Sequence, residues 1–571
     1  MTIFSAPRAR WILQEPESQS LVALSQSPLG VALPPLIRRL LALRSLTGEA
    51  AMRSFLQPRL ADLSDPFALP DMRLAVERIF TAIARQEHIV LYGDYDVDGV
   101  TSLTIMTLVL RAYGANPHCF LPLRMGEGYG LSHDGLERCF EEHGKPQLLI
   151  AMDCGTGSVA EVAWLRDQGV ECIIVDHHEP GEARPDCVAL VNPKVGSAMT
   201  YFCTAGLAFK LAHALLKERR LESFDLREHL DLVALGTVAD LVPLMEENRT
   251  LVRKGLEKLG ETTKAGLCAL KVIAGLDGAI QAPHIGFRLG PRLNAAGRLD
   301  TAQTALDLLL CEDPAEAREC AELLDAHNRE RQHVEETVRR EAAAMLEADP
   351  TVAEGPCIVL GSRAWHSGVV GIVASRIMRE FHRPTVLIAF DEHGLGRGSG
   401  RSVPGVSLVE ALNRCRHLLA GGGGHDMAVG LSLPEENFAA FRHAMREAVA
   451  SLTAVEGLSP LLELEAEIRL AELVPEFYRH YLHLEPFGMG NPEPIFLCRR
   501  VEPQLPGTVL KERHWKLLLR QGAEVRPAMW FNAPIAAPPT APWDVAFKLQ
   551  RHLWRGQESW QLMICAVREA E

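Results

Sequence analysis

The chain has 571 residues, 47% of them hydrophobic and 23% charged, which predicts three or four domains of ordinary globular composition. Its net charge of −14 argues against non-specific coating of nucleic acid but permits a local basic channel. Residues 1–30 contain no long apolar segment, so neither a secretory signal nor a membrane anchor is expected. The 13 cysteines form no C-x-x-C pair, so we expect reduced thiols and a cytoplasmic protein.

The pattern before residue 88 is helical. Pro34 and Pro35 precede an amphipathic segment at 36–43, and a second helix is expected at 71–86. From residue 88 onward, short apolar runs alternate with helical segments, which is typical of an α/β fold with a mostly parallel sheet. The predicted strands cover 88–92, 117–122, 147–152, 171–175 and 187–191. Ligands bind at the carboxyl ends of such strands, so the polar residues that follow them are the candidates for a site.

Three carboxylates follow the first of these strands. Asp94, Asp96 and Asp98 alternate along a strand-to-helix turn, and Gly99 is expected to permit the change of direction. Because the three like charges repel one another, a divalent cation such as Mg²⁺ or Mn²⁺ is the usual compensation. The alternative is a cluster of helix N-cap residues, which explains one aspartate better than three.

Further metal-competent side chains follow two other predicted strands. They are Asp153 after 147–152, and Asp176, His177 and His178 after 171–175. Taken singly, such an aspartate is usually a turn residue and such a histidine is usually structural. Their shared sheet edge favours a metal site, because carboxylates and imidazoles together can hold two divalent ions for attack at phosphorus. Asp240, after the apolar segment 232–239, is either a further ligand or simply the end of a helix.

Residues 301–350 are predicted to form a long connecting helix. Asp313 would cap it, with Pro314 at the first helical position and Glu316 at the capping-box position. Apolar residues recur only sparsely, so we expect a mostly polar strut between domains. Its arginines are interpreted as a solvated face rather than a DNA track: Arg329, Arg331, Arg339 and Arg340.

Residues 353–452 predict a second α/β unit, with strands at 356–361 and 385–390 around a helix at 368–381. The glycine-rich stretch 394–405 follows. Its glycines would let a phosphate approach Ser399 and Arg401 closely, and the alternative is a flexible hairpin. The glycines at 421–424, ahead of His425, are ambiguous.

The segment 459–571 differs from the rest of the chain. It contains five of the eight tryptophans: Trp515, Trp530, Trp543, Trp554 and Trp560. Within it, residues 499–555 carry ten Lys or Arg against four Asp or Glu. Short β-like runs predict a small barrel, and they lie at 507–510, 515–519, 526–531, 545–549 and 559–566. Basic residues between aromatic ones suit a platform for single-stranded nucleic acid, whereas the alternative is an aromatic core with solubilising charge.

These motifs together resemble the DHH phosphoesterase superfamily. The segments that carry the resemblance are Asp-Tyr-Asp-Val-Asp-Gly at 94–99, Asp-Cys-Gly at 153–155, Asp-His-His at 176–178 and Val-Ala-Asp at 238–240. Segments at 127–131, 235–240, 290–298, 368–372, 398–402 and 421–425 are similar to the RecJ family of single-strand-specific exonucleases. Cys154 replaces the usual Asn and Gly422 a common Phe, but no expected metal ligand is missing.

The resemblance implies a set of metal ligands. Asp153 would bridge two divalent cations, Mn²⁺ or Mg²⁺. Asp96 would bind one cation, and Asp98, His177 and Asp240 would bind the other. Asp94 would be a further ligand or a support. Asp176 is expected to orient His177 by a hydrogen bond, and His178 is expected to face the substrate.

The resemblance also implies the substrate contacts, which are Arg124, Arg292, Asn294, Arg298, His366, Ser399, Arg401, His425 and Trp515. Arg124, Ser399 and Arg401 would bind a terminal 5′-phosphate in a cleft between domains. The expected domains are a lead-in with a DHH catalytic domain (1–300), a connector helix (301–350), a DHHA1-type domain (351–455) and an OB-fold-like single-strand-binding domain (456–571).

The activity that the resemblance implies is metal-dependent 5′-to-3′ hydrolysis of single-stranded DNA to mononucleotides, in recombination and repair. Single-strand-binding protein and a helicase are the expected partners, and no membrane is expected. One alternative is a phosphodiesterase for short oligonucleotides or cyclic dinucleotides, which would not need the basic C-terminal segment. The other is a catalytically dead replication scaffold, which would have lost metal ligands.

Overall fold

The computed structural model describes residues 9–123, 127, 130–299, 301–453, 458–534, 538–554 and 557–570. The chain divides into two compact units. The larger consists mainly of Trp11–Leu293 and Glu463–Glu571, and the smaller mainly of Ala321–Leu462. The larger unit therefore joins the first half of the chain to its C-terminal domain.

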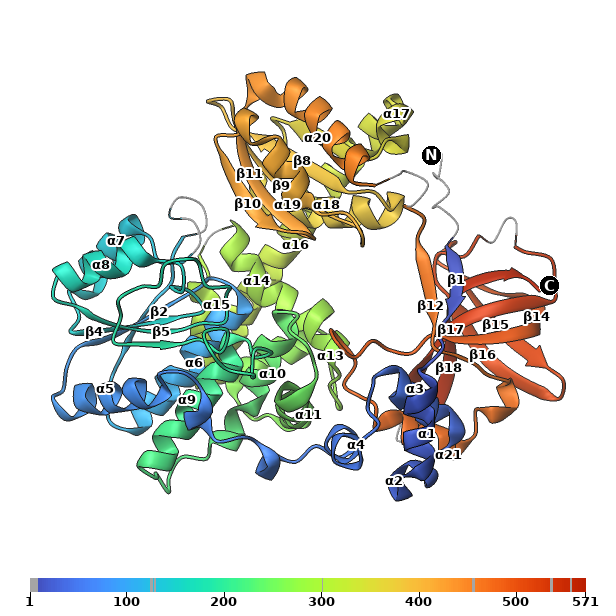
Figure 1. Cartoon of the computed structure of the whole chain (residues 1–571), viewed down its shortest axis with the longest axis horizontal. Helices are drawn as coiled ribbons and strands as arrows, with labels where there is room; N and C mark the ends of the chain where they lie inside the picture. Colours follow the sequence, from blue (N-terminus) through green and yellow to red (C-terminus); the bar gives the residue numbers. More distant parts are fainter. Residues whose placement is uncertain are drawn as a thin grey trace. The chain divides into compact units, whose positions relative to one another are not determined.

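The larger unit contains the predicted parallel sheet, with strand order β3-β2-β4-β5-β6. Its strands are β2 (Ile89–Gly93), β3 (His118–Phe120), β4 (Leu148–Met152), β5 (Glu171–Val175) and β6 (Ala189–Val191), which confirms the prediction. Helices cover both faces, so β2 and β4 are buried throughout (Figure 1). One face carries α7 (His133–His143) and α8 (Val159–Asp167), and the other carries α5 (Met72–Ala84), α6 (Val97–Ala112) and α9 (Thr204–Glu218).

Further helices follow α9 along the chain. They are α10 (Leu230–Ala239), α11 (Glu246–Glu261), α12 (Ala265–Ile273), α13 (Ala282–His284), the π-helix η4 (Ile285–Leu289), α14 (Gly290–Leu299) and α15 (Gln303–Leu310). The short 3₁₀ turns of this part are η1 (Leu60–Asp62), η2 (Pro66–Ala68) and η3 (Leu226–His229). α10 is buried over all but its last residue, because it lies against α6, α9 and α11. It therefore ends close to the sheet.

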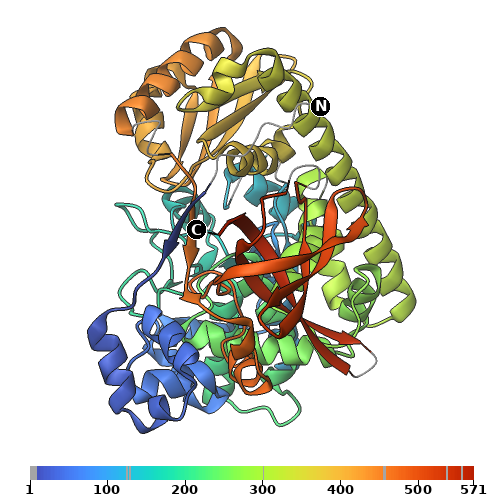
Figure 2. The same cartoon turned by 90° about the vertical axis from the view of Figure 1, so that its right-hand side faces the viewer.

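The C-terminal domain is a closed barrel, as predicted (Figure 2). Its strands are β14 (Phe496–Leu510), β15 (His514–Gln521), β16 (Glu524–Trp530), β17 (Trp543–Trp554) and β18 (Gln557–Glu569). β14 pairs with both β15 and β17, which closes the barrel. It is preceded by β12 (Leu461–Leu464), which pairs with β1 (Arg10–Leu13), and by β13 (Ala466–Glu467), η8 (Leu470–Glu472) and α21 (Pro475–Leu482).

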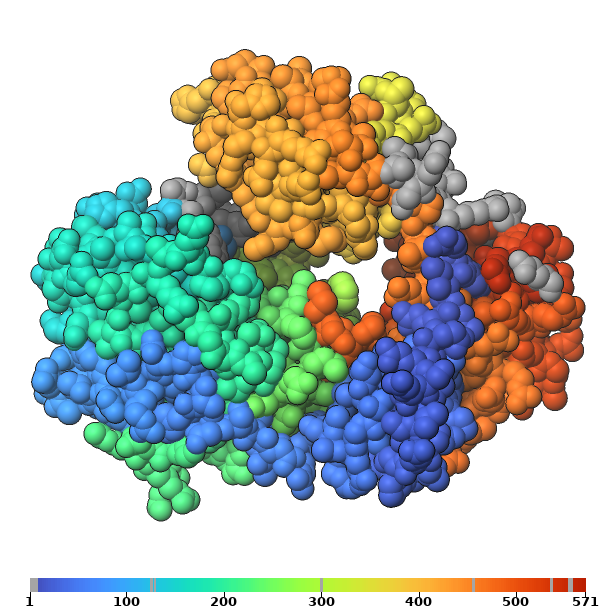
Figure 3. Space-filling view, viewed as in Figure 1, coloured from blue at the N-terminus to red at the C-terminus, as the bar shows by residue number. Residues whose placement is uncertain are grey.

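The lead-in helices share their hydrophobic core with this barrel. They are α1 (Ser18–Gln26), α2 (Pro28–Val31), α3 (Pro35–Leu43) and α4 (Glu49–Leu56). Buried residues such as Ile37 and Phe55 belong to the same cluster as Phe477 and Trp543. Figure 3 shows the blue lead-in lying directly against the orange-red C-terminal domain. The lead-in helices and the C-terminal domain therefore fold together within the larger unit.

The smaller unit is built on a mixed sheet with strand order β10-β11-β9-β8-β7. Its elements are α17 (Pro350–Glu354), β7 (Ile358–Ser362), α18 (Ser367–Phe381), β8 (Thr385–Phe390), β9 (Leu395–Arg401), α19 (Leu408–Arg414), η5 (Arg416–Leu418), β10 (Gly421–His425), β11 (Ala428–Pro434), η6 (Glu435–Asn437) and α20 (Phe438–Leu452). The glycine-rich stretch is the central strand β9 rather than a flexible hairpin. A Cβ at Gly398 would lie 2.8 Å from Ile388, so the glycines permit close packing of the core.

The connector is one helix, α16 (Pro314–Ala348), and it starts where predicted. Asp313 Oδ1 accepts hydrogen bonds from the amides of Ala315 at 2.8 Å and Glu316 at 3.0 Å. The interpretation of Arg331 as part of a solvated face is wrong. Its side chain is buried, where it contacts Glu335 and donates to Asn328 Oδ1 at 2.6 Å.

Candidate metal centre

The turn between β2 and α6 holds the first group of carboxylates. Asp96 is the N-cap of α6, and its Oδ1 accepts from the amides of Asp98 at 2.8 Å and Gly99 at 3.2 Å. The N-cap interpretation is therefore correct for Asp96 alone, whereas Asp94 and Asp98 are buried. Gly99 was expected to permit the change of direction, but its φ is not positive. A Cβ there would lie 2.3 Å from the carbonyl oxygen of Asp94, so close packing explains the glycine.

The carboxylate of Asp98 is held by the first amides of α9. Oδ2 accepts from the Thr204 amide at 2.7 Å, and Oδ1 accepts from the Ala205 amide at 2.8 Å. The N-terminus of a helix presents free amide groups, so it is a suitable place to fix a carboxylate by hydrogen bonds. Thr204 also donates from Oγ1 to Asp153 Oδ1 at 2.8 Å. The sequence interpretation missed this residue, which serves two carboxylates at once.

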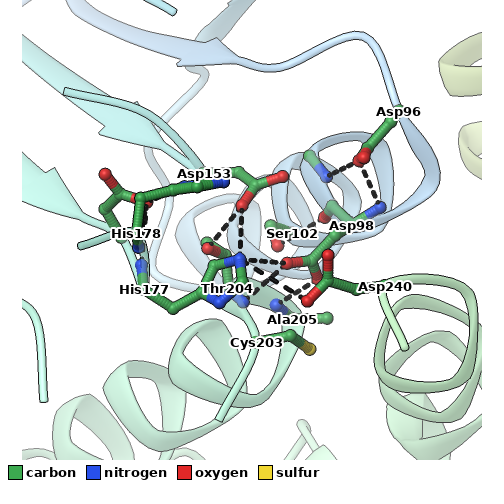
Figure 4. Close-up of polar contacts among 12 residues, drawn as sticks. Asp96, Asp98, Ser102, Asp153, His177, His178, Cys203, Thr204, Ala205 and Asp240 are labelled. Atoms are coloured by element: carbon green, nitrogen blue, oxygen red, sulfur yellow. Dashed lines mark hydrogen bonds and ion pairs between the residues drawn. The ribbon is translucent and has the colours of Figure 1, made fainter. Parts of the chain in front are cut away.

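Three carboxylates surround one imidazole nitrogen (Figure 4). His177 Nε2 lies 3.4 Å from Asp153 Oδ1, 3.5 Å from Asp240 Oδ2 and 3.8 Å from Asp98 Oδ2. Both His177 Nε2 and Asp240 Oδ2 are buried without a hydrogen-bond partner. Ligand atoms about 2.0–2.2 Å from one octahedral Mn²⁺ or Mg²⁺ lie about 3 Å apart when adjacent and about 4 Å apart when opposite, and the three distances fall between these values. The spacing and the donor set therefore fit a divalent cation.

A second group of carboxylates shares Asp153 with the first. Asp94, Asp96 and Asp153 bring one oxygen each within 4.8 Å of one another. Asp153 follows β4 with φ of +67°, a strained conformation of the kind that gathers at functional sites. Its carboxylate thus lies between the Asp94–Asp96 pair and His177, where a bridging ligand is expected.

The charges of the cluster demand compensation. Burial, reinforced by Asp98 and Asp96, raises the pKa of Asp153 well above its ordinary value. The same causes raise the pKa of Asp240 to about 9. Burial also lowers the pKa of His177, which favours the neutral imidazole that a metal requires. Divalent cations would allow these carboxylates to remain ionised at neutral pH.

The expected role of Asp176 is wrong in one respect. Its Oδ1 lies 2.7 Å from Nδ1 of His178, so it orients His178 rather than the ring of His177. Burial opposes ionisation of Asp176, but hydrogen bonds from His178 and Thr156 lower its pKa below the ordinary value. The side chain of His178 is 43% exposed, so it can still reach a substrate.

Two neighbouring residues shape the site without binding metal. Burial raises the pKa of the Cys154 thiol well above its ordinary value, so the thiol is protonated and unsuited to act as a nucleophile. Gly236 of α10 lies where a Cβ would be 2.5 Å from Ala205 Cβ and 2.9 Å from Asp98 Oδ1. Only glycine lets α10 approach closely enough to present Asp240.

The remaining predicted residues lie outside this cluster. Arg124 and the side chain of Arg298 fall outside the described residues. Arg292 and Asn294 lie on α14, where Arg292 Nη1 donates to the Arg288 carbonyl at 2.6 Å.

In the smaller unit, Arg401 Nη1 donates to Ser399 Oγ at 2.9 Å, and both side chains lie against Gly371 of α18. His366 caps that helix by accepting from the Gly368 amide at 3.1 Å. His425 is two strands away from Arg401, opposite Ala428.

Trp515 does not have the exposure that base stacking requires. It is 4% exposed, and its Nε1 donates to the Pro506 carbonyl at 2.8 Å. Trp530 stacks beside it and Trp543 meets it edge-on. The alternative interpretation, an aromatic core, is correct for these three tryptophans. The expected stacking role of Trp515 is contradicted by its burial.

Family models match three parts of the chain: the N-terminal domain of the DHH family at 88–237, the DHHA1 domain at 354–451 and the RecJ OB domain at 464–566. Together with the cluster, they define a DHH-type phosphoesterase. Among curated proteins, the single-stranded-DNA-specific exonuclease RecJ of Escherichia coli is 34% identical over 93% of this chain and 95% of its own. The RecJ of Bacillus subtilis is 37% identical over 92% of this chain and 66% of its own.

The chain belongs to the RecJ family. The crystal structure of RecJ in complex with Mn²⁺ from Thermus thermophilus matches it with a TM-score of 0.82 and 31% identity, over 99% of this chain and 80% of that one. A Mg²⁺ complex of the same protein matches with a TM-score of 0.75. Mn²⁺ or Mg²⁺ is thus the cofactor that suits the cluster. Among the described residues, every helix is too short or too polar to cross a bilayer.

Proposed function

We propose that this protein is a metal-dependent exonuclease that hydrolyses single-stranded DNA from its 5′ end to mononucleotides. The observation that carries the proposal is the convergence of Asp98, Asp153 and Asp240 on His177, in a chain of the RecJ family. Curated relatives are named single-stranded-DNA-specific exonucleases. The 5′-to-3′ direction follows from the family resemblance.

The proposed ligands fall into two sets that share Asp153. Asp98, His177 and Asp240 belong to one set and Asp96 to the other, with Asp94 as a further ligand or support. When bound, the divalent cations would activate a water molecule, polarise the phosphodiester and stabilise the leaving 3′-oxygen.

The protein's own contribution is to hold these ligands rigid. The α9 amides fix Asp98, and Thr204 fixes Asp153. Asp176 fixes His178, which would face the scissile phosphate. No protein nucleophile is required, in keeping with the protonated thiol of Cys154.

Ser399 and Arg401 are the proposed contacts for a 5′-phosphate, because their side chains are already paired and the guanidinium offers forked donors. Arg124, Arg292, Asn294, Arg298, His366 and His425 remain proposed substrate contacts. We further propose a cytoplasmic role in recombination and repair, in contact with single-strand-binding protein and a helicase.

The direct test is digestion of a long single strand labelled at one end, with and without Mn²⁺. Wild-type protein should release mononucleotides only with the metal, and Asp153→Ala should abolish the reaction, because the shared ligand of both sets is lost. Asp167→Ala, an exposed acid at the end of α8, is the matched control. Activity confined to short oligonucleotides or cyclic dinucleotides would favour the phosphodiesterase instead. Folded protein that binds the strand but never cleaves it would favour the scaffold.

A further inference from the structure

Arg249 is a buried arginine whose guanidinium donates to main-chain carbonyls of other elements. It lies near the start of α11 and is 1% exposed. Its Nε donates to the carbonyl of Phe55 at 2.7 Å, and its Nη2 donates to the carbonyls of His483 at 2.9 Å and Glu485 at 2.7 Å. Nη1 approaches the Pro486 carbonyl at 3.4 Å. A planar guanidinium suits this arrangement, because its five N–H donors point outward in a fixed fork.

These contacts join three parts of the chain. α11 belongs to the catalytic half and Phe55 to lead-in helix α4. Residues 483–486 connect α21 to the C-terminal barrel. The guanidinium also lies over the Phe55 ring, 3.6 Å from its centroid. One side chain therefore fixes both the lead-in and the entry to the barrel against the helix that follows Asp240.

The segment 483–491 is itself held in shape. Asn491 is fully buried, and its Nδ2 donates to the carbonyls of Leu484 at 2.8 Å and Pro486 at 2.9 Å. The segment also pairs with the loop between α10 and α11. The Leu244 amide donates to the Met489 carbonyl at 2.8 Å, four residues after the proposed ligand Asp240. The segment that leads into the barrel is thus held beside the loop that follows Asp240.

We propose that Arg249 is a positioning residue that fixes the placement of the barrel relative to the metal centre, here called their register. This placement would let one long DNA strand engage both. The inference rests on the proposed function. Two linked binding surfaces strengthen each other only when their geometry allows simultaneous engagement. Loss of the register should therefore cost affinity for strands long enough to reach both surfaces. It should leave the chemistry at the metals unchanged.

The test compares Arg249→Lys with wild type on a long strand and on a short oligonucleotide that fills only the metal centre. Lysine keeps the charge but cannot donate in a fork to two segments at once. We expect KM for the long strand to rise about tenfold or more, while kcat on both substrates and KM for the short one stay within about twofold. Arg253→Lys, one turn further along α11, is the matched control. The Nη1 group of Arg253 donates to the lead-in carbonyl of Leu56 at 3.1 Å, so this variant tests the lead-in contact alone.

Asn491→Ser removes the hydrogen bonds that shape segment 483–491. It should therefore also raise KM for the long strand. A merely structural role would lower the melting temperature and affect both substrates equally, and that result would overturn the proposal. Wild-type protein offers a check that needs no variant. If kcat/KM of the wild-type protein does not rise with strand length, one strand does not engage the barrel and the metal centre together, and the proposal is overturned. Absence of metal-dependent hydrolysis in wild type would instead refute the proposed function.

Discussion

Removal of one hydroxyl from the first residue of α9 should loosen the metal centre. Thr204 donates from its amide to Asp98 and from Oγ1 to Asp153. The substitution Thr204→Val keeps the volume and the amide but deletes the bond from Oγ1 to Asp153. It therefore perturbs only the carboxylate that the two ligand sets share.

The structure suggests the size of the effect. A hydrogen bond to a charged group contributes about 1.5–3 kcal/mol. Each factor of ten in an equilibrium constant corresponds to about 1.4 kcal/mol. The affinity for Mn²⁺ should fall about ten- to a hundredfold, which is also the usual cost of losing the support of a metal ligand. Because the Thr204 amide remains in place, the fold around Asp98 should be preserved.

The assay is the Mn²⁺ concentration that gives half-maximal hydrolysis of a short single strand, together with the free Mn²⁺ measured by electron paramagnetic resonance. Thr204→Ser is the matched control, because it retains the hydroxyl and loses only the methyl group. Its Mn²⁺ dependence should stay close to that of wild type. If Thr204→Val had wild-type Mn²⁺ dependence and melting temperature, the reasoning that Thr204 holds Asp153 in place would be refuted.

Three further outcomes are expected. Gly236→Ala should destabilise the fold by about 1–3 kcal/mol, the usual cost of overpacking, and raise the Mn²⁺ requirement. Urea unfolding would check it, with Gly260→Ala, whose nearest neighbour would be 3.5 Å away, as the tolerated control. Trp515→Ala should cost about 3–5 kcal/mol of stability, and an unchanged stability with lost DNA affinity would contradict its place in the core. Arg401→Ala should weaken use of 5′-phosphorylated strands by about 1.5–3 kcal/mol. Use of 5′-hydroxyl strands should change much less. An equal loss of activity on 5′-phosphorylated and 5′-hydroxyl strands would count against a terminal-phosphate contact.

The carboxylates of the metal centre could be predicted because parallel strands bring their carboxyl ends to one edge. Asp94, Asp153 and His177 each follow a buried strand, and the strand order sets those ends side by side. The partner of Asp176 could not be predicted in the same way. His177 and His178 are adjacent in sequence, and only the turn after β5 decides which ring faces the carboxylate.

The supports of the cluster left no local signal in the sequence. Thr204 contacts Asp153 across 51 residues and Asp98 across 106. Gly236 is one glycine within a mostly apolar helix, and the neighbours that exclude a larger side chain belong to α6 and α9. Contacts of this kind depend on how buried helices pack, which hydrophobic periodicity does not specify.

The amino-acid composition of the barrel predicted exposed tryptophans, whereas the alternation along its strands would have predicted buried ones. Along β15, Trp515, Leu517 and Leu519 are buried, whereas Lys516 and Arg520 are exposed. Side chains alternate between the two faces of a strand, so a tryptophan that shares its face with two leucines points into the barrel. On this strand the basic residues Lys516 and Arg520 lie on the opposite face. Attraction between this outward face and a DNA strand would therefore depend on charge more than on stacking by these tryptophans, and it should weaken steeply as salt rises.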